Sequence, residues 1–231
     1  MDAFHPFTPV HALALAAIAA ATALAIRAAR RASGDRATVE RRVGAAFVAT
    51  WLAVHGWWLL PPRFDPLTTL PLQMCHLAAL GAGLYLVTGA RRLAVLVYFW
   101  GFALCTQALV TPTLQEGPVS HVFWYFWLSH GMIVGVAAYA IAVHRFRPTW
   151  RDWRFACAAA AVYAAIVLPI DLALGANYGF LGPTVPDRPT LVDVLGRWPQ
   201  RLIAIGALVA AAMALLMLPW RAAGAPRRAA R

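Results

Sequence analysis

Two side chains that can carry out acyl chemistry together lie in apolar stretches of the chain, the thiol of Cys75 and the imidazole of His130. A thiol among apolar side chains is a weak nucleophile until a base takes its proton, and an imidazole from a second helix can be that base. His130 lies roughly 16 Å inside the apolar run 120–143, at the helical rise of 1.5 Å per residue. Ionisable residues at such depth are usually functional. The pair therefore predicts a cysteine nucleophile with a histidine base, with a packing thiol and an interhelical hydrogen bond as the plainer alternatives.

Three further polar residues are candidates to bind a substrate carbonyl or its oxyanion. Gln107 and Thr111 are four residues apart and share one face of a predicted helix, and Asn177 lies in the long connection 175–200. Amide and hydroxyl groups can donate hydrogen bonds to a developing negative charge. Bonding of Gln107 and Thr111 to a neighbouring helix is an equally good interpretation of that pair.

A metal site is not expected from the spacing of the ligand-type residues. His121 and His130 are nine residues apart and so point to opposite faces of one helix, while Cys75 and His76 are adjacent and about 100° apart. No carboxylate lies deep in an apolar run to complete a ligand set. We therefore expect neither a metal nor another cofactor.

The elements that must position these residues are membrane-spanning helices. Hydrophobic residues make up 61% of the 231 residues and charged residues only 13%, which is far from the composition of soluble domains. The net charge of +11 comes from arginines in short blocks between apolar runs, which argues against a nucleic-acid-binding face. All three cysteines lie in apolar runs, where free thiols are expected.

The sequence predicts an all-α, polytopic membrane protein with about seven spans that form a single transmembrane domain over residues 1–231. The predicted spans are 10–26, 43–60, 70–87, 93–110, 119–143, 153–174 and 202–218. Sixteen arginines fall in alternate loops and the C-terminal tail on one side, and four on the other. The positive-inside rule then predicts an outer N-terminus and an inner C-terminus.

With this topology, the polar residues of the spans gather in the half that faces outward. This predicts a polar cavity that opens toward the outer leaflet. The Gly- and Pro-rich connection 175–200 lies on the same side, and long loops of this kind are often functional covers. The polar residues in question are His55, Gln73, Cys75, His76, Cys105, Gln107, Thr111, His121, His130 and Asp171.

Five segments, in order along the chain, are YFWGFALCTQALVTPTL (98–114), HVFWYFWLSHGMIV (121–134), FRPTW (146–150), GANYGFL (175–181) and LVDVLGRWP (191–199). Together they resemble the bacterial integral membrane family related to eukaryotic transmembrane protein 164. The resemblance implies a multi-span membrane protein whose eukaryotic relatives move a fatty acyl chain onto a lyso ether phospholipid. That activity is attributed to a cysteine early in one span and a histidine on a later one, and the matching positions here are Cys75 and His130.

The function expected from residues and resemblance together is a lipid acyltransferase that works through a Cys75 thioester with His130 as base. The expected partners are membrane lipids, without nucleic acid or an obligate protein partner, and the expected location is the bacterial inner membrane. The alternative is a transporter or a binding protein for a lipid or small solute, in which His130 binds or carries a proton. The absence of an internal repeat and of a second deep ionisable residue weakens the transporter interpretation.

Overall fold

The computed structural model describes residues 3–183 and 191–223, and every regular element in these ranges is a helix. The longer α-helices are α1 (Pro9–Arg31), α2 (Arg36–Trp58), α3 (Met74–Thr88), α4 (Arg91–Trp100), α6 (His121–Ala142), α7 (Trp150–Leu174) and α8 (Arg201–Leu215). The shorter elements are the π-helix η1 (Gly101–Cys105), α5 (Thr106–Val110), the 3-10 helices η2 (Tyr178–Phe180) and η3 (Leu191–Leu195), and α9 (Leu218–Ala223). The all-α prediction is confirmed for the described residues.

Five of these helical segments are long and apolar enough to cross a membrane, which supports a polytopic membrane protein. They are α1, the continuous segment Arg91–Val110, α6, α7 and the segment Arg201–Trp220. The other two predicted spans behave differently. The helix α3 is apolar but has only 15 residues, and α2 has 23 residues but begins with Arg36, Glu40, Arg41 and Arg42. The count of seven spans and their orientation therefore stay predictions.

Local sequence signals set the helix ends. Thr8, Asp35, Ser120 and Thr149 each accept a hydrogen bond from a backbone N–H of the first turn that follows them. These bonds satisfy donors that the helix itself leaves open. The span predicted from residue 70 begins only at Met74, because residues 70–73 form a turn instead of a first helical turn.

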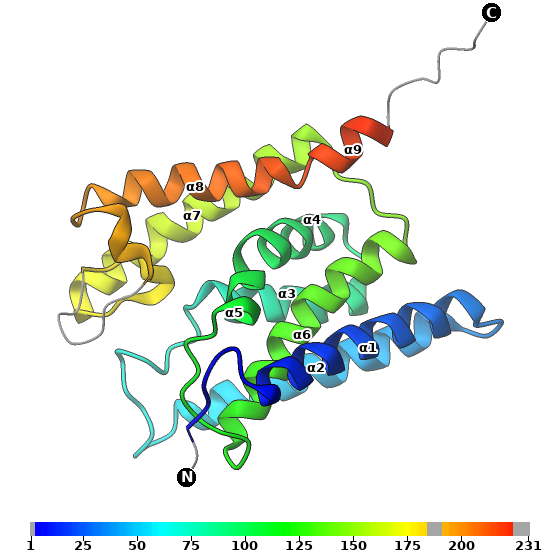
Figure 1. Ribbon diagram of the computed structural model, residues 1–231, viewed down its shortest axis with the longest axis horizontal. Coiled ribbons are helices and arrows are strands. Elements are labelled where there is room, and N and C mark those ends of the chain that lie inside the picture. The colour runs from blue at the N-terminus through cyan, green and yellow to red at the C-terminus, as the bar shows by residue number, and fades with distance from the viewer. Residues whose placement is uncertain (1–2, 184–190, 224–231) are drawn as a thin grey trace, which may run out of the picture.

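The helices pack in layers around α3, α4 and α6 (Figure 1). In this view α7 and α8 run side by side along one side, while α1 packs on α6 and α2 on α3 along the other. The central helices carry most of the buried core, to which α8 adds Met213. The connections 59–73 and 111–120, together with residues 175–183 and 191–200, lie at one end of the helices, here called the loop end. The opposite end, where α1 ends at Arg31 and where α2 and α4 begin at Arg36 and Arg91, is called the arginine end.

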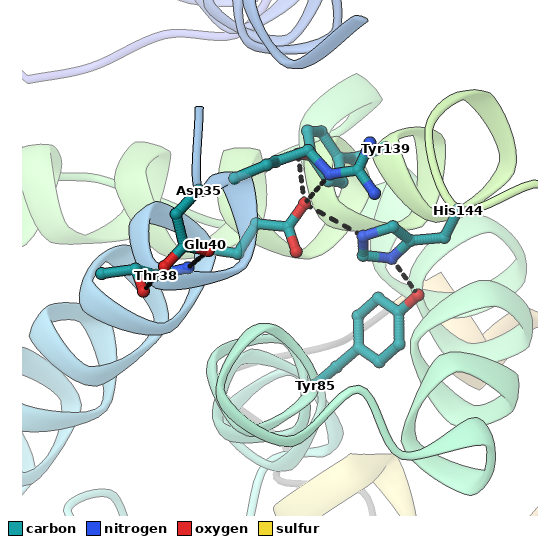
Figure 2. A network of polar contacts seen from close by, with 7 residues as sticks. Asp35, Thr38, Glu40, Tyr85, Tyr139 and His144 are labelled. Atoms are coloured by element: carbon teal, nitrogen blue, oxygen red, sulfur yellow. Dashed lines mark hydrogen bonds and ion pairs between the residues drawn. The ribbon is translucent and has the colours of Figure 1, made fainter. Parts of the chain in front are cut away.

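A polar network joins α2, α3 and α6 at the arginine end (Figure 2). One oxygen of Glu40 accepts a hydrogen bond from the Tyr139 hydroxyl at 2.6 Å, and it lies 3.0 Å from Nε2 of His144 and 3.2 Å from Nε of Arg36. Nδ1 of His144 lies 2.6 Å from the Tyr85 hydroxyl. Because Tyr85 belongs to α3, Glu40 to α2 and Tyr139 to α6, the network fixes how these three helices meet.

Two glycines let α2 and α3 cross at very short range. A Cβ atom on Gly44 would lie 2.6 Å from the carbonyl oxygen of Gly83, and one on Gly83 would lie 2.8 Å from a methyl group of Val48. No larger residue fits at either position without a shift of one helix. The crossing therefore sets the register in which the polar side chains of α2 and α3 meet nearer the loop end.

Candidate functional site

Cys75 lies in the first turn of α3, at the loop end of the bundle. Its side chain is half-buried and packs against the main core, and it forms no disulfide. The first N–H groups of a helix have no partner within the helix and attract negative charge. A thiolate at Cys75 would therefore lie where the backbone of α3 favours an anion.

The segment after α7 covers the turn that leads into α3. The N–H of Gly179 donates to the side-chain oxygen of Gln73 at 2.9 Å, and the Tyr163 hydroxyl donates to the carbonyl oxygen of Leu72 at 2.6 Å. The Tyr178 hydroxyl donates to the carbonyl oxygen of Pro66 at 2.9 Å. The predicted cover of this end is thus present over residues 175–183, while residues 184–190 of the same connection lie outside the described part of the chain.

His130 is buried in α6, with 5% of its surface exposed. Its Nδ1 lies 2.9 Å from the carbonyl oxygen of Phe126. A carbonyl oxygen only accepts, so Nδ1 must carry the proton, and Nε2 of the neutral ring keeps its lone pair. No described residue hydrogen-bonds to Nε2, and the imidazole is therefore held in the tautomer that a general base needs.

Two more histidines meet next to Cys75. The ring of His76, the residue after the cysteine, lies 4.6 Å from the ring of His55 on α2. Nδ1 of His55 donates to the carbonyl oxygen of Trp51 at 2.9 Å, and the Trp51 indole N–H donates to the carbonyl oxygen of His76 at 2.9 Å. His76 also interacts electrostatically with His130. Imidazoles from α2, α3 and α6 thus form one group, here called the histidine cluster: His55, His76 and His130.

The predicted pair of Cys75 and His130 is not joined by a hydrogen bond between the two side chains. Catalytic hydrogen bonds are often long before the substrate binds, so this geometry leaves the pair as a prediction.

The three predicted oxyanion residues lie in different places. The side chains of Gln107 and Thr111 are exposed, and the Thr111 hydroxyl donates to the backbone carbonyl of Gln107 at 3.3 Å, which closes the end of α5. The side-chain oxygen of Asn177 accepts from the N–H of Gly182 at 3.0 Å and so closes its own loop. No described contact brings any of the three to Cys75, and their role stays a prediction.

The sequence model of the TMEM164 family matches residues 6–217. The chain belongs to the TMEM164 family. Neither a curated protein nor a solved structure matches it. All five candidate residues of this TMEM164-family chain lie inside the matched range. The family assignment and the apolar helices together support a multi-pass membrane protein.

The contact between His55 and His76 was missed in the sequence of this TMEM164-family chain. Both residues could be assigned to the outward-facing half of their spans, but nothing in their spacing shows that they touch. The π-helix η1, which ends at the buried Cys105, was also missed. Within the described ranges, no group of three or more His, Cys, Asp or Glu residues has the geometry to hold a metal ion.

Proposed function

We propose that this chain is a membrane lipid acyltransferase that transfers a fatty acyl group through a thioester on Cys75, with His130 as general base. The observation that carries the proposal is the tautomer of His130. Its Nδ1 proton is committed to the carbonyl oxygen of Phe126, so Nε2 is ready to accept a proton, next to the histidine that follows Cys75. Membership of the TMEM164 family supports the same chemistry by the resemblance described above.

In the first half of the reaction, the thiol proton of Cys75 moves to Nε2 of His130 and the thiolate attacks the ester carbonyl carbon of a phospholipid. An S–C bond forms and the C–O bond to the glycerol breaks. The leaving alkoxide takes the proton from His130 and departs as a lysolipid.

In the second half, His130 takes the proton of an acceptor lysolipid hydroxyl, and the oxygen attacks the thioester carbonyl. The C–S bond breaks, and the thiolate of Cys75 recovers the proton from His130. An ester is exchanged for an ester, so the reaction balances without a cofactor or an energy source. Gln107, Thr111 or Asn177 would donate to the oxyanion in each half, a contribution of about 3–4 kcal/mol in well-studied acyl-transfer enzymes.

The topology proposed with this function has seven spans, with the N-terminus outside and the C-terminus inside. It makes the loop end the outer end and so gives Cys75 access to lipids of the outer leaflet of a bacterial inner membrane. The arginine end then lies at the cytoplasmic face, in agreement with the positive-inside rule.

The test is acyl exchange by the purified protein in lipid nanodiscs. The protein receives a phospholipid with an isotope-labelled acyl chain and an unlabelled lysolipid, and mass spectrometry follows both the lipids and the intact protein. We expect an acyl mass on the wild type, no such mass on Cys75→Ala, and loss of exchange in Cys75→Ala and His130→Gln.

Cys157→Ala is the matched control, because this thiol lies in α7 toward the arginine end, 4.0 Å from the sulfur of Met213. Exchange that persists in Cys75→Ala would disprove the mechanism. Proton-coupled solute uptake into vesicles, without an acyl mass on any residue, would instead identify a carrier.

A further inference from the structure

An open groove lies between α2 and the start of α6 at the loop end. Its volume is about 300 Å³, and its lining residues are Ala53, Val54, Trp57, Trp58 and His121. The rings of Trp58 and His121 stack at 5.9 Å and join the two helices across it. All of the lining except His121 is apolar or aromatic, so the groove suits a hydrocarbon chain.

A positive charge lies at the rim of this groove. The guanidinium carbon of Arg63 is 4.0 Å above the ring of Trp57, which lines the groove. Both side chains are exposed, and Arg63 forms no ion pair with any carboxylate in the described part of the chain. Arginine binds phosphate oxygens through parallel N–H groups. The imidazole of His121 is a further polar group in the lining.

The histidine cluster begins one helical turn beyond the groove. His55 lies three residues before Trp58 on α2, and Tyr125 lies four residues after His121 on α6, so each pair shares one helix face. The rings of His55 and Tyr125 are 5.9 Å apart, one turn deeper than the stack of Trp58 on His121. His55 in turn contacts His76, the neighbour of Cys75.

We propose that this groove binds one glycerophospholipid, with an acyl chain along Val54, Trp57 and Trp58 and the phosphate at Arg63 and His121. The apolar lining requires hydrocarbon and the rim requires an anionic group, and a phospholipid offers both in one molecule. As a route by which an ester reaches Cys75, the inference rests on the proposed function. As a binding site, it stands on the groove and its rim alone.

The experiment is photocrosslinking in nanodiscs with a phosphatidylcholine that carries a diazirine on one acyl chain, followed by peptide mapping. We expect labelling of residues 53–58 and 121–125. Ala53→Trp fills the groove from an exposed position and should lower this labelling at least fivefold, whereas Val162→Trp, at an exposed position of α7, should not change it.

The phosphate contact is tested with Arg63→Gln. We expect about fivefold weaker labelling by the phospholipid, as for the loss of one arginine near a lipid phosphate. Labelling by a diazirine diacylglycerol, which lacks the phosphate, should be the same in Arg63→Gln as in the wild type. Arg197→Gln, an exposed arginine at the same end of the bundle, is the control. If the extent of labelling is the same in Ala53→Trp and in Arg63→Gln as in the wild type, the inference is wrong.

The Cys75→Ala variant separates this inference from the proposed function. Suppose that the groove is still labelled in Cys75→Ala but the wild type shows no acyl exchange. The lipid site would then be supported and the acyltransferase function disproved. Acyl exchange that is intact in Ala53→Trp would retain the enzyme and disprove the groove as its lipid route.

Discussion

The rings of His55 and His76 meet edge to face at 4.6 Å and join α2 to α3 beside the candidate nucleophile Cys75. Nδ1 of His76 is buried and has no hydrogen-bond partner in the described part of the chain. A buried polar atom without a partner costs about 1–3 kcal/mol. This cost is easiest to understand if His76 serves the reaction, for example by bonding a polar group of the bound lipid.

Replacement of His76 by phenylalanine tests this role. We expect His76→Phe to leave the melting temperature unchanged or raise it, because the unsatisfied nitrogen is removed and an aromatic ring is kept. Acyl exchange should fall at least tenfold, because the ring nitrogen that bonds a polar group of the bound lipid is lost. Exchange at the wild-type rate would mean that His76 only packs. The exposed His5 provides the control, His5→Phe, which should alter neither quantity.

The crossing of α2 and α3 at Gly44 and Gly83 is tested by adding one methyl group. In Gly83→Ala the new Cβ would meet a methyl group of Val48 at 2.8 Å, so the helices must separate. We expect a loss of about 1–3 kcal/mol in the free energy of unfolding, as for other overpacked sites. Weaker acyl exchange should accompany it, since the contact of His55 with His76 depends on the register of this crossing.

The matched control is Gly56→Ala on the same α2 helix. A Cβ at Gly56 meets no atom within 4 Å, and alanine is about 1 kcal/mol more favourable than glycine inside a helix. Gly56→Ala should therefore melt at the same or a higher temperature. A Gly83→Ala variant as stable as Gly56→Ala would show that the crossing has room for a side chain.

The helices could be predicted from the sequence, while their mutual contacts could not. Each apolar run is a local property, and capping residues such as Ser120 and Thr149 mark where helices begin. The register between helices depends instead on close approaches such as that of Gly44 to Gly83. The spacing of residues in the sequence does not predict these approaches. For this reason His55 and His76 were recognised as polar residues of one membrane half but not as neighbours.

The mutual arrangement of the predicted site residues could not be read from the sequence, for a related reason. Depth along a span is readable from residue number, and it predicts that Cys75 and His130 lie in the same half of the bundle. Which way a side chain points depends on its partners. Thr111 bonds to the backbone of α5 and Asn177 to its own loop. Local bonds of this kind compete with a role in substrate binding and are invisible before the loop conformations are known.

The network at the arginine end should stabilise the fold without taking part in the chemistry. Tyr139→Phe removes the hydrogen bond of 2.6 Å to the Glu40 carboxylate. Because hydrogen bonds to charged groups are the stronger kind, we expect a loss of about 2 kcal/mol in the free energy of unfolding. Thermal melting in detergent measures it.

Arg36→Gln is the control for the network, because its ion pair with Glu40 is partly exposed and such pairs contribute little. It should change the melting temperature much less than Tyr139→Phe. Equal effects of the two variants would show that the network acts mainly through its charges and not through the tyrosine hydroxyl.

The cap of α2 makes a small, pH-dependent contribution to stability. Hydrogen bonds from the side chain and the backbone N–H of Thr38 hold the pKa of Asp35 below its ordinary value of 3.8. A carboxylate with a lowered pKa stabilises the fold above its unfolded pKa, and the contribution is lost as the pH falls through the folded value. The difference in melting temperature between wild type and Asp35→Asn should therefore shrink from about pH 5 to about pH 3. A difference that is constant over this range would contradict the assignment.

The cover over the start of α3 should control access to Cys75. Gly179 has a φ of 61°, and a Cβ atom there would lie 2.3 Å from the Tyr163 hydroxyl, so Gly179→Ala must displace residues 175–183. The bond from the Gly179 N–H to Gln73 would break with it. We expect alkylation of Cys75 by a water-soluble maleimide to become at least severalfold faster, while Cys157, far from this loop, reacts as before. Gly196→Ala is the matched control, because Gly196 also has a positive φ but a Cβ there meets no atom within 4 Å. An unchanged rate at Cys75 in Gly179→Ala would mean that water reaches the thiol by another path, and that the segment after α7 braces α3 without closing the site.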